Sequence, residues 1–260
     1  MDTLLEARHV SYSYHSLSGE TPALSDISFS VEEGSFLALV GPSGCGKSTL
    51  LSLLAALMEP ESGTITIQGR PASEYRGKIG YMLQKDHLFE WRTIWKNVTL
   101  GLEIQKRMTR ENLARTEQMM RDYGLWEFRD ARPSELSGGM RQRAALIRTL
   151  APDPGLLLLD EPFSALDYQT RLNVCDDVCQ IIKKERKTAI LVTHDLSEAI
   201  SAADRVLVLG RRPARIRLDL PLSFADSSLT PMERRQAPEF REYFNLIWKE
   251  LNADEDRDRN

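Results

Sequence analysis

A glycine-rich segment with a lysine and two hydroxyl side chains at its end occupies residues 41–49, which read GPSGCGKST. This spacing fits G-x-x-x-x-G-K-[ST], the pattern of a phosphate-binding loop. Its three glycines allow a tight turn in which backbone N–H groups converge on phosphate oxygens. Lys47 would place a cation on the β- and γ-phosphates, Ser48 would offer its hydroxyl to Mg²⁺, and Thr49 would contact a phosphate. The segment predicts a nucleoside triphosphate site.

Two neighbouring carboxylates, Asp160 and Glu161, follow four leucines at residues 156–159. A buried strand would deliver both to its carboxyl end, where open α/β sheets bind ligands. Asp160 is then suited to hold a Mg²⁺-bound water, and Glu161 to accept a proton from an attacking water as general base. The pair predicts hydrolytic chemistry beside the phosphate loop.

A third segment, LSGGMRQR at residues 136–143, enters a predicted helix. Ser137 is a suitable N-cap. Gly138 and Gly139 leave backbone N–H groups exposed at the positive end of that helix, which makes a second anion-binding site.

The elements that must position these segments follow from the hydrophobic pattern. Residues 36–40 are continuously apolar, as in a strand covered on both faces, and further apolar runs occur at 156–159, 189–193 and 206–209. Helical segments separate these runs, which favours an α/β fold with a parallel sheet and right-handed crossovers. Alternating apolar residues before residue 70 predict half-buried antiparallel strands.

The middle and the end of the chain differ from this pattern. Residues 85–151 have little strand character and predict an inserted helical subdomain, with helices over 110–123 (Thr109 as N-cap) and 138–151. In the tail, apolar residues recur at helical spacing. They are Phe240, Phe244, Ile247, Trp248 and Leu251. This amphipathic helix either docks on the body or binds a partner.

Composition excludes some classes of function. The 260 residues include 34 Lys plus Arg and 38 Asp plus Glu, a formal net charge of −4, so we expect no nucleic-acid partner bound by bulk positive charge. The longest apolar stretch, residues 50–58, is shorter than the roughly 20 residues that a bilayer requires, so we expect no membrane span. The first ten residues lack a secretion signal, and we expect the three cysteines to stay reduced.

Together, the phosphate loop, LSGGMRQR and LLLLDEP resemble, in this order, the nucleotide-binding subunit of ATP-binding cassette (ABC) transporters over about residues 4–220. Further motifs match as well. Gln84 in YMLQKD resembles the Q-loop, residues 164–167 resemble the D-loop, and His194 in VTHD resembles the switch histidine. Tyr14 in VSYSY resembles the aromatic residue that stacks on adenine, with Tyr12 as a close alternative.

The resemblance implies a P-loop NTPase (RecA-like) fold: a mixed sheet core, an antiparallel β subdomain and an inserted α-helical subdomain. It implies a nucleotide-binding domain over residues 1–220, with its helical subdomain over 85–151, and a C-terminal extension over 221–260. It implies a Mg²⁺-dependent ATPase that works as a head-to-tail dimer with two ATP molecules between the subunits. We expect the dimer partner to be a second copy of this chain, because both half-sites are intact. A heterodimer is the alternative.

The resemblance also assigns residues to roles. The catalytic residues would be Lys47, Gln84, Glu161 and His194. The metal ligands would be Ser48, Gln84 and Asp160. The nucleotide contacts would be Tyr14, Gly41, Ser43, Gly44, Cys45, Gly46, Lys47, Ser48 and Thr49, with Ser137, Gly138, Gly139 and Asp167 acting across the dimer seam.

A narrower resemblance is to the ATPases of importers for nitrate, sulfonate, taurine and pyrimidine precursors. It rests on GPSGCGKSTLL, LFEWRTIWKNVTLGLE, DEPFSALD and the final PEF…IW helix. The chain departs from that pattern at Phe89-Glu90, where Leu-Pro is usual, at Ala56, where glycine is usual, and at Leu83, where phenylalanine is usual. The identity of the transported solute is therefore not inferred from these relatives.

Transport would need partners. The resemblance implies a separate membrane permease, a solute-binding protein or domain, and a location at the cytoplasmic face of the inner membrane. Large apolar residues after Gln84 are either the permease contact or part of the subdomain interior. They are Leu88, Phe89, Trp91 and Trp95, beside His87. Alternatives are an exporter ATPase, a soluble ABC ATPase not tied to transport, and a degenerate regulatory cassette.

Overall fold

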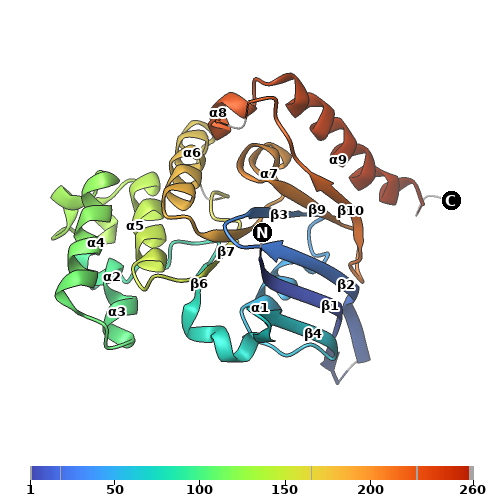
Figure 1. The fold of residues 1–260 in the computed structure, drawn as a ribbon, viewed down its shortest axis with the longest axis horizontal. Helices are drawn as coiled ribbons and strands as arrows, with labels where there is room; N and C mark the ends of the chain where they lie inside the picture. The colour runs from blue at the N-terminus through green and yellow to red at the C-terminus, as the bar shows by residue number, and fades with distance from the viewer. Residues whose placement is uncertain (1, 18, 165, 227, 258–260) are drawn as a thin grey trace.

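The computed structural model describes residues 2–17, 19–164, 166–226 and 228–257, and two β-sheets organise it (Figure 1). The larger sheet has the strand order β10-β9-β3-β8-β7-β6. Its strands are β3 (Phe36–Val40), β6 (Ile79–Met82), β7 (Leu156–Asp160), β8 (Thr188–Val192), β9 (Arg205–Leu209) and β10 (Ile216–Pro221). Neighbours pair in parallel except for β10, which is antiparallel to β9. The sheet is mixed, as expected.

The smaller sheet is antiparallel, with the order β2-β1-β4-β5. Its strands are β1 (Thr3–Ser16), β2 (Gly19–Glu32), β4 (Ser62–Ile67) and β5 (Arg70–Pro71). Ile27, Phe29 and Val31 alternate with more exposed residues along β2, and all three are buried. The alternation in the sequence therefore reflects a sheet with one face against the core.

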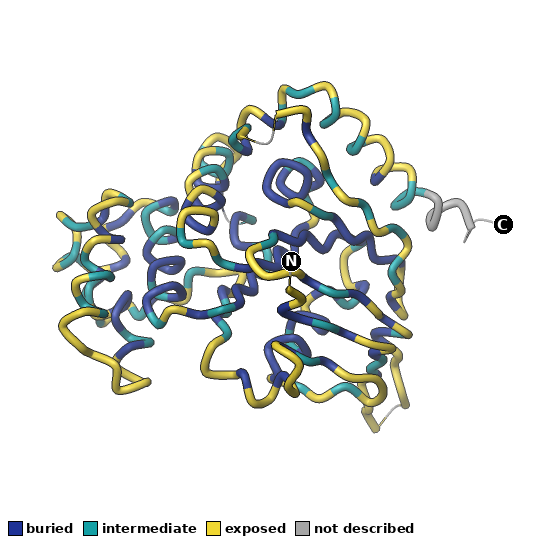
Figure 2. Tube along the Cα trace, viewed as in Figure 1, coloured by how far each residue is buried: buried dark blue, intermediate teal, exposed yellow. Residues whose placement is uncertain are grey.

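Strand β3 lies between two hydrophobic cores (Figure 2). Leu37 and Leu39 pack in one core with the antiparallel sheet and helix α1 (Lys47–Leu54). Phe36, Ala38 and Val40 pack in the other core, which includes residues of helices α5 (Gly138–Leu150), α6 (Tyr168–Lys184) and α7 (Leu196–Ala202). Burial on both faces explains why this strand is apolar at every position.

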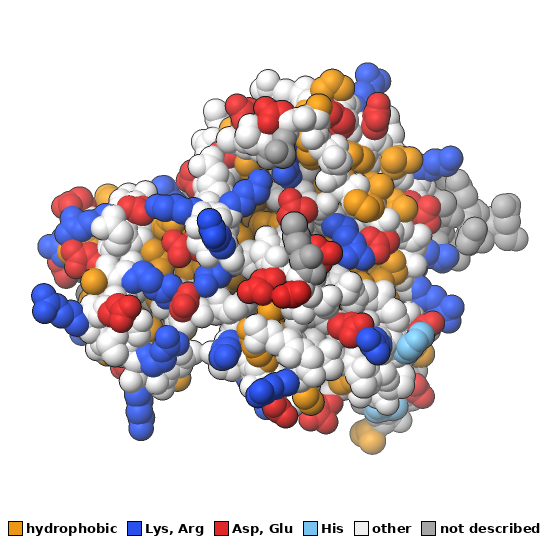
Figure 3. Space-filling view, in the orientation of Figure 1, with side chains coloured by type: hydrophobic (Ala, Val, Ile, Leu, Met, Phe, Trp, Pro, Cys, Tyr) orange, Lys and Arg blue, Asp and Glu red, His pale blue; other side chains and the backbone are white. Residues whose placement is uncertain are grey.

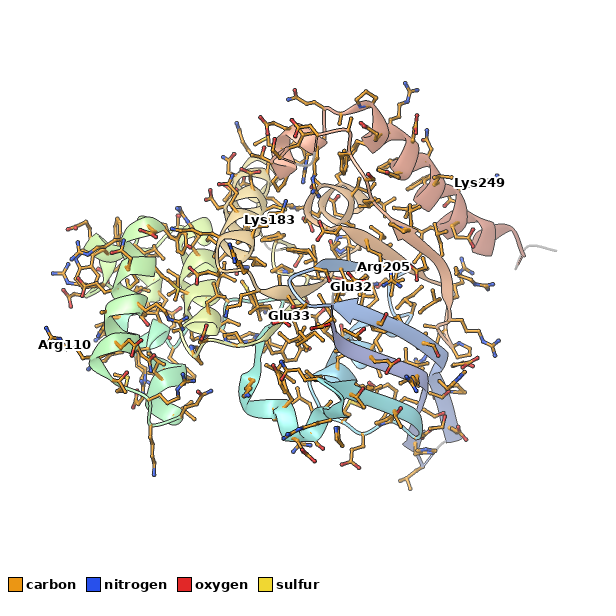
Figure 4. All side chains as sticks on the ribbon, viewed as in Figure 1. Glu32, Glu33, Arg110, Lys183, Arg205 and Lys249 are labelled. Carbon is orange, nitrogen blue, oxygen red and sulfur yellow. The ribbon has the colours of Figure 1, made fainter. Side chains whose placement is uncertain are left out.

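The regular elements of residues 85–151 are all helical. They are α2 (Ile94–Val98), α3 (Leu100–Ile104), α4 (Arg110–Asp122) and α5 (Gly138–Leu150), with short 3₁₀ turns at Trp126–Phe128 and Pro133–Glu135. These helices form a group to one side of the sheets, and Arg110 lies at its far edge (Figures 1 and 4). The predicted helices over 110–123 and 138–151 are confirmed to within one residue, and Thr109 caps α4 by accepting from the Asn112 N–H at 3.2 Å.

The end of α1 shows why glycine is usual at position 56, where this chain has alanine. The Ala56 N–H donates to the Leu53 carbonyl at 2.9 Å, and the Leu57 N–H donates to the Ser52 carbonyl at 3.0 Å. This pair of bonds is a Schellman motif, whose C′ residue adopts the left-handed conformation that glycine favours. Ala56 occupies that position with φ 53°, so an alanine here carries backbone strain.

The remaining helices cover the larger sheet and its C-terminal side. They are α6 (Tyr168–Lys184), α7 (Leu196–Ala202), α8 (Pro231–Arg234) and α9 (Pro238–Arg257), with a 3₁₀ segment at Ala72–Lys78 before β6. Ile247 of α9 is fully buried in the same core as α7, and Phe244 is partly buried there. Helix α9 thus docks on the body, whereas its Trp248 is 54% exposed. Hydrophobic side chains are visible on the α9 side of the space-filling view (Figure 3).

One arginine ties the two sheets together. Arg205 at the start of β9, labelled beside Glu32 in Figure 4, donates to the Ser30 carbonyl of β2 at 2.8 Å and pairs with Asp219 of β10. Among the described residues, we find no helix with the length and apolar character that crossing a bilayer would require.

Candidate active site

The phosphate loop connects β3 to α1, and its last glycine is sterically required. Gly46 has φ 121° and immediately precedes α1. A Cβ atom at this position would lie 2.9 Å from Leu24 Cδ2 and 3.0 Å from the Ala23 carbonyl oxygen. Any side chain would therefore push the loop away from β2. The loop reaches the N-terminus of α1 because it can pass this close to residues 23–24.

The cation of the loop faces inward. Lys47 is buried, and its ammonium donates to the carbonyl oxygens of Gly41 at 2.8 Å and Pro42 at 2.9 Å. Ser48, one position later on α1, is exposed and donates through its hydroxyl to Asp160 Oδ1 at 3.3 Å. The first turn of α1 and the end of β7 therefore meet, as the two motifs predict.

The acidic pair sits at the carboxyl end of β7. Burial raises the pKa of Asp160 above its usual range, despite the opposing effects of Ser48 and Lys47. Glu161 has φ 45°, in the left-handed region, and its N–H donates to the Val192 carbonyl of β8 at 2.8 Å. A non-glycine residue held in this region costs of order 1–3 kcal/mol, and such strain clusters at functional sites.

Two further predicted residues converge on Glu161. Gln84, which follows β6, donates through Nε2 to Glu161 Oε2 at 3.4 Å and to Ser164 Oγ at 3.3 Å. His194, which follows β8, has its Nδ1 3.1 Å from the same Oε2. Three adjacent parallel strands thus end in one cluster made of an amide, a carboxylate and an imidazole.

A cavity of about 430 Å³ lies over the phosphate loop. The predicted residues that line it are Ser43, Gly44, Gly46, Lys47, Ser48, Thr49, Gln84, Asp160 and Glu161. Gly41 and Cys45 are buried under the loop and do not line the cavity, and burial raises the pKa of the Cys45 thiol. The structure therefore brings together most of the expected nucleotide contacts with the expected water-activating carboxylate.

Of the two candidate aromatic residues, Tyr14 is the one beside the phosphate loop. Its hydroxyl is 2.9 Å from Thr49 Oγ1, and its side chain is 41% exposed. Tyr12 is partly buried against the core, and its ring meets the Tyr14 ring edge-on with centroids 5.2 Å apart. Tyr14 is therefore available to a base, and Tyr12 supports it from behind.

The segment at residues 137–139 lies elsewhere. Ser137 is exposed and caps α5, because its hydroxyl accepts from the Met140 N–H at 3.3 Å. Gly138 lines a second cavity, of about 340 Å³, and none of residues 137–139 lines the cavity over the phosphate loop. Asp167 is exposed and caps α6 through the Thr170 N–H at 3.1 Å; its neighbour Ala165 lies outside the described residues.

Asp86 connects the segment after Gln84 to α5. Its carboxylate accepts from Arg141 Nε at 3.1 Å, and its carbonyl accepts from Arg148 Nη2 at 2.6 Å. Both arginines belong to α5, whose first turn carries residues 138–139. The loop that begins at Gln84 and the helix that begins at Ser137 are therefore one connected unit.

The apolar residues after Gln84 divide into buried and exposed ones. Leu88 is buried, and Trp95 packs edge-on against Trp126 with ring centroids 5.9 Å apart. Trp91 is 72% exposed and is in contact only with Phe89 among the aromatic side chains described, at a centroid distance of 4.8 Å.

A single amide holds the backbone around Phe89 and Trp91. Asn97 is fully buried, accepts from the Phe89 N–H at 2.7 Å, and donates to the carbonyl oxygens of Phe89, Arg92 and Thr93. The loop that presents Trp91 is therefore fixed from below, because each backbone group bonded to Asn97 would be costly to leave unsatisfied.

Two residues of the cavity lining, Ala23 and Arg212, were missed by the sequence analysis. Arg212 lies in the connection between β9 and β10, and its guanidinium carbon is 5.8 Å from the centroid of the Tyr14 ring. The sequence carries a signal for this connection, since Ile216, Leu218 and Leu220 alternate with polar residues as in an edge strand. That pattern predicts β10 and the turn before it, but not the position of this turn beside the phosphate loop.

Comparison with known proteins agrees with this geometry. The profile of the family described as ABC transporter matches residues 24–164. An ABC transporter ATP-binding protein of Bacillus subtilis (strain 168) is 46% identical over 258 residues, 99% of each chain. A nitrate import ATP-binding protein of Synechocystis sp. is 39% identical over 233 residues, 88% of each chain.

A solved structure is similar as well. It is a dimeric ATP-binding cassette in a post-hydrolysis state bound to ADP and Pi, with a TM-score of 0.71 and 27% identity, covering 85% of this chain and 99% of that one. The P-loop NTPase fold, the cavity that joins the phosphate loop to the acidic pair, and these relatives lead to one conclusion. The chain belongs to the ABC transporter family and is an ATP-hydrolysing subunit of that family.

Proposed function

We propose that this chain powers an importer of a small solute, by closing on a second copy of itself around two ATP molecules and reopening after hydrolysis. The observation that carries the proposal is the position of residues 137–139. They form a positive helix start at which Ser137 is exposed, Gly138 is half-buried and Gly139 is buried, yet none of them lines the cavity over the phosphate loop of their own chain. A γ-phosphate held by a second copy is the anion that this helix start fits.

Within one cavity, the residues divide the work of hydrolysis. Lys47 leaves its carbonyl partners to neutralise charge that develops on the transferred phosphoryl group. Glu161 accepts the proton of the attacking water, because its carboxylate is the acceptor on which Gln84 and His194 converge. Gln84 orients that water, and His194 contacts the γ-phosphate.

The residues present fit a magnesium ion. Ser48, Gln84 and Asp160 offer a hydroxyl, an amide and a carboxylate oxygen at one place, and Mg²⁺ prefers such oxygen ligands together with substrate phosphates. When bound, Mg²⁺ would neutralise phosphate charge.

The second half of each site would come from the partner copy. Its residues 137–139 would contact the γ-phosphate, and its Asp167, exposed at the start of α6, would lie across the seam. The similar solved cassette is a dimer, which supports this arrangement. Removal of the γ-phosphate would remove the bridge between the copies, and the dimer would open.

Coupling to transport would pass through the loop after Gln84. Exposed Trp91 packs against half-buried Phe89 on a backbone held by Asn97, and this pair is the proposed contact with a separate membrane permease. The nitrate import relative supports import as the direction. A solute-binding protein or domain would deliver the solute, and the chain would lie at the cytoplasmic face of the membrane.

The dimer can be tested with the Glu161→Gln variant, which keeps the shape of the side chain and removes the base. Analytical ultracentrifugation with ATP and Mg²⁺ should show a doubling of mass, and the same sample with ADP should remain a monomer. A monomer at saturating ATP would overturn the shared site. Co-purification with the permease, with ATP hydrolysis rising in the complex, would test the coupling separately.

A further inference from the structure

We propose that Arg212 closes over the nucleobase of the bound nucleotide, as a second wall opposite Tyr14. Arg212 lines the cavity over the phosphate loop, and its guanidinium carbon lies over the Tyr14 ring, 5.8 Å from the ring centroid. The inference rests on the proposed role of Tyr14 as the platform for the base. It adds a contact that comes from the far end of the chain.

The backbone around Arg212 is fixed beside the phosphate loop. The Ala214 N–H donates to the Ala23 carbonyl at 2.9 Å, and the Ser25 N–H donates to the Ala214 carbonyl at 2.9 Å. Arg212 itself donates through Nε to the Pro22 carbonyl at 3.1 Å. The turn between β9 and β10 is thus bonded to residues 22–25, and the same stretch approaches Gly46 of the phosphate loop. The root of the Arg212 side chain is therefore held next to the site.

The spacing suits a planar group that yields to a base. A flat base in contact with one planar group on each side needs about 7 Å between them, because carbon atoms in contact are about 3.5 Å apart. The observed 5.8 Å is slightly less. The Arg212 side chain is exposed, so it can move outward by the small difference between these two distances. The base would then lie between the Tyr14 ring and the guanidinium.

The chemistry of the three groups agrees. Arginine stacks on aromatic faces through its delocalised charge, and nucleobases stack on aromatic and guanidinium planes. Lys47, the other cation that lines the cavity, is bound to the loop carbonyls at the phosphate end. Tyr14 is bonded to Thr49, at the end of that loop. Arg212 is therefore placed for the base end of the nucleotide, whereas Lys47 is placed for the phosphates.

The test is calorimetric titration of the full-length protein with ADP, and with inorganic tripolyphosphate as a probe that has phosphates but no base. Arg212→Ala should weaken ADP binding about five- to tenfold, at the lower end of the effect of one stacking contact, and leave tripolyphosphate binding unchanged. Arg212→Lys, which keeps the charge and loses the plane, should restore less than half of the loss. Arg215→Ala is the matched control, because Arg215 is in the same turn, bonds Ser25, and does not line the cavity.

The outcomes separate the two proposals. Tyr14→Ala should weaken ADP binding as well, and loss in both Tyr14→Ala and Arg212→Ala supports the two-walled site. Loss in Tyr14→Ala alone overturns the role of Arg212 and leaves the proposed function in place. Equal loss of ADP and tripolyphosphate binding in Arg212→Ala, or full rescue by lysine, would mean a phosphate contact instead. An intact melting temperature in each variant excludes misfolding as the cause.

Discussion

His194 Nδ1 lies 3.1 Å from Oε2 of Glu161, and the Gln84 amide approaches the same oxygen at 3.4 Å. These side chains follow β8, β7 and β6, three neighbouring parallel strands, so the sheet itself sets the spacing among them. A carboxylate with two polar neighbours that differ in chemistry is suited to orient a water molecule and accept its proton.

Glu161→Gln should leave ATP affinity within about twofold and lower the rate of hydrolysis by about 10²–10⁴, the usual contribution of a general base. The amide keeps the shape of the side chain and cannot take a proton. Steady-state phosphate release measures the rate, and fluorescence titration measures ATP affinity. Near-normal hydrolysis would refute the assignment of Glu161.

Ser137→Arg combined with Glu161→Gln should prevent the ATP-dependent dimer, because a bulky cation would fill the space in front of the α5 N-terminus. Ser134→Arg is a matched control, since Ser134 is exposed three residues earlier and adds the same charge. Sedimentation velocity with ATP should show a monomer for the first combination and a dimer for the control. Dimers in both would place the seam elsewhere.

Trp91→Ala should leave folding and basal ATP hydrolysis intact and reduce the stimulation of hydrolysis by the permease, because the side chain is 72% exposed. Trp95→Ala provides the contrast, since that ring packs on Trp126; it should lower the free energy of unfolding by about 2–4 kcal/mol. Chemical denaturation and hydrolysis with the reconstituted permease distinguish the two. Loss of basal hydrolysis in Trp91→Ala would show an internal role.

Ala56→Gly should raise the free energy of unfolding by about 0.5–1 kcal/mol, because it relieves the left-handed conformation at the end of α1. Ala55→Gly, one residue earlier and right-handed with φ −75°, should lower it by a similar amount. Urea denaturation of both variants gives the comparison. Destabilisation by Ala56→Gly would contradict the strain argument.

Glu198→Gln should change how stability depends on pH. Burial raises the pKa of Glu198, whose carboxylate accepts from Thr193 Oγ1 at 2.6 Å with Arg171 and Asp195 nearby. Between the ordinary pKa of glutamate, about 4.3, and the raised value, the folded state holds the proton and the unfolded state does not. This carboxyl therefore makes stability fall as pH rises through that window, and the loss persists above it.

Denaturation across that window should show that wild type loses stability relative to Glu198→Gln as pH rises. Glu233→Gln is the opposite control, because its bonds to Thr230 lower the pKa of Glu233. The stability that Glu233 contributes is present above its ordinary pKa and declines as pH falls. Parallel pH profiles for wild type and Glu198→Gln would disprove the effect of burial.

The parts of the site that the sequence predicts are those encoded in short contiguous segments. Residues 41–49 combine the strand end, the turn and the helix start, so their spacing alone specifies a phosphate loop. Asp160 and Glu161 follow because a fully apolar strand must end at the edge of the sheet where ligands bind. The helices over 110–123 and 138–151 were predictable from their capping residues.

The rest depends on contacts between distant segments. Arg212 reaches the cavity because it bonds to Pro22, 190 residues earlier. Local sequence patterns carry no information about a contact between residues so far apart. Tyr12 and Tyr14 are two residues apart on one strand, so alternation gives them the same face; irregular pairing of β1 with β2 between Tyr12 and Ser13 then separates their environments. The buried Asn97 fixes the loop that decides which of Leu88, Trp91 and Trp95 is exposed. The hydrophobic residues of that loop follow neither helical nor strand periodicity.

In the proposed dimer, Asp86 would couple the two nucleotide sites mechanically. Its side chain and its carbonyl both bind α5, so a displacement of the loop that carries Trp91 would reach Gln84, beside one proposed ATP, and the start of α5, which would face the other. A displacement caused by a partner protein would thus reach both nucleotide sites at once. In a symmetric dimer, such coupling would favour simultaneous hydrolysis of the two ATP molecules over alternating hydrolysis.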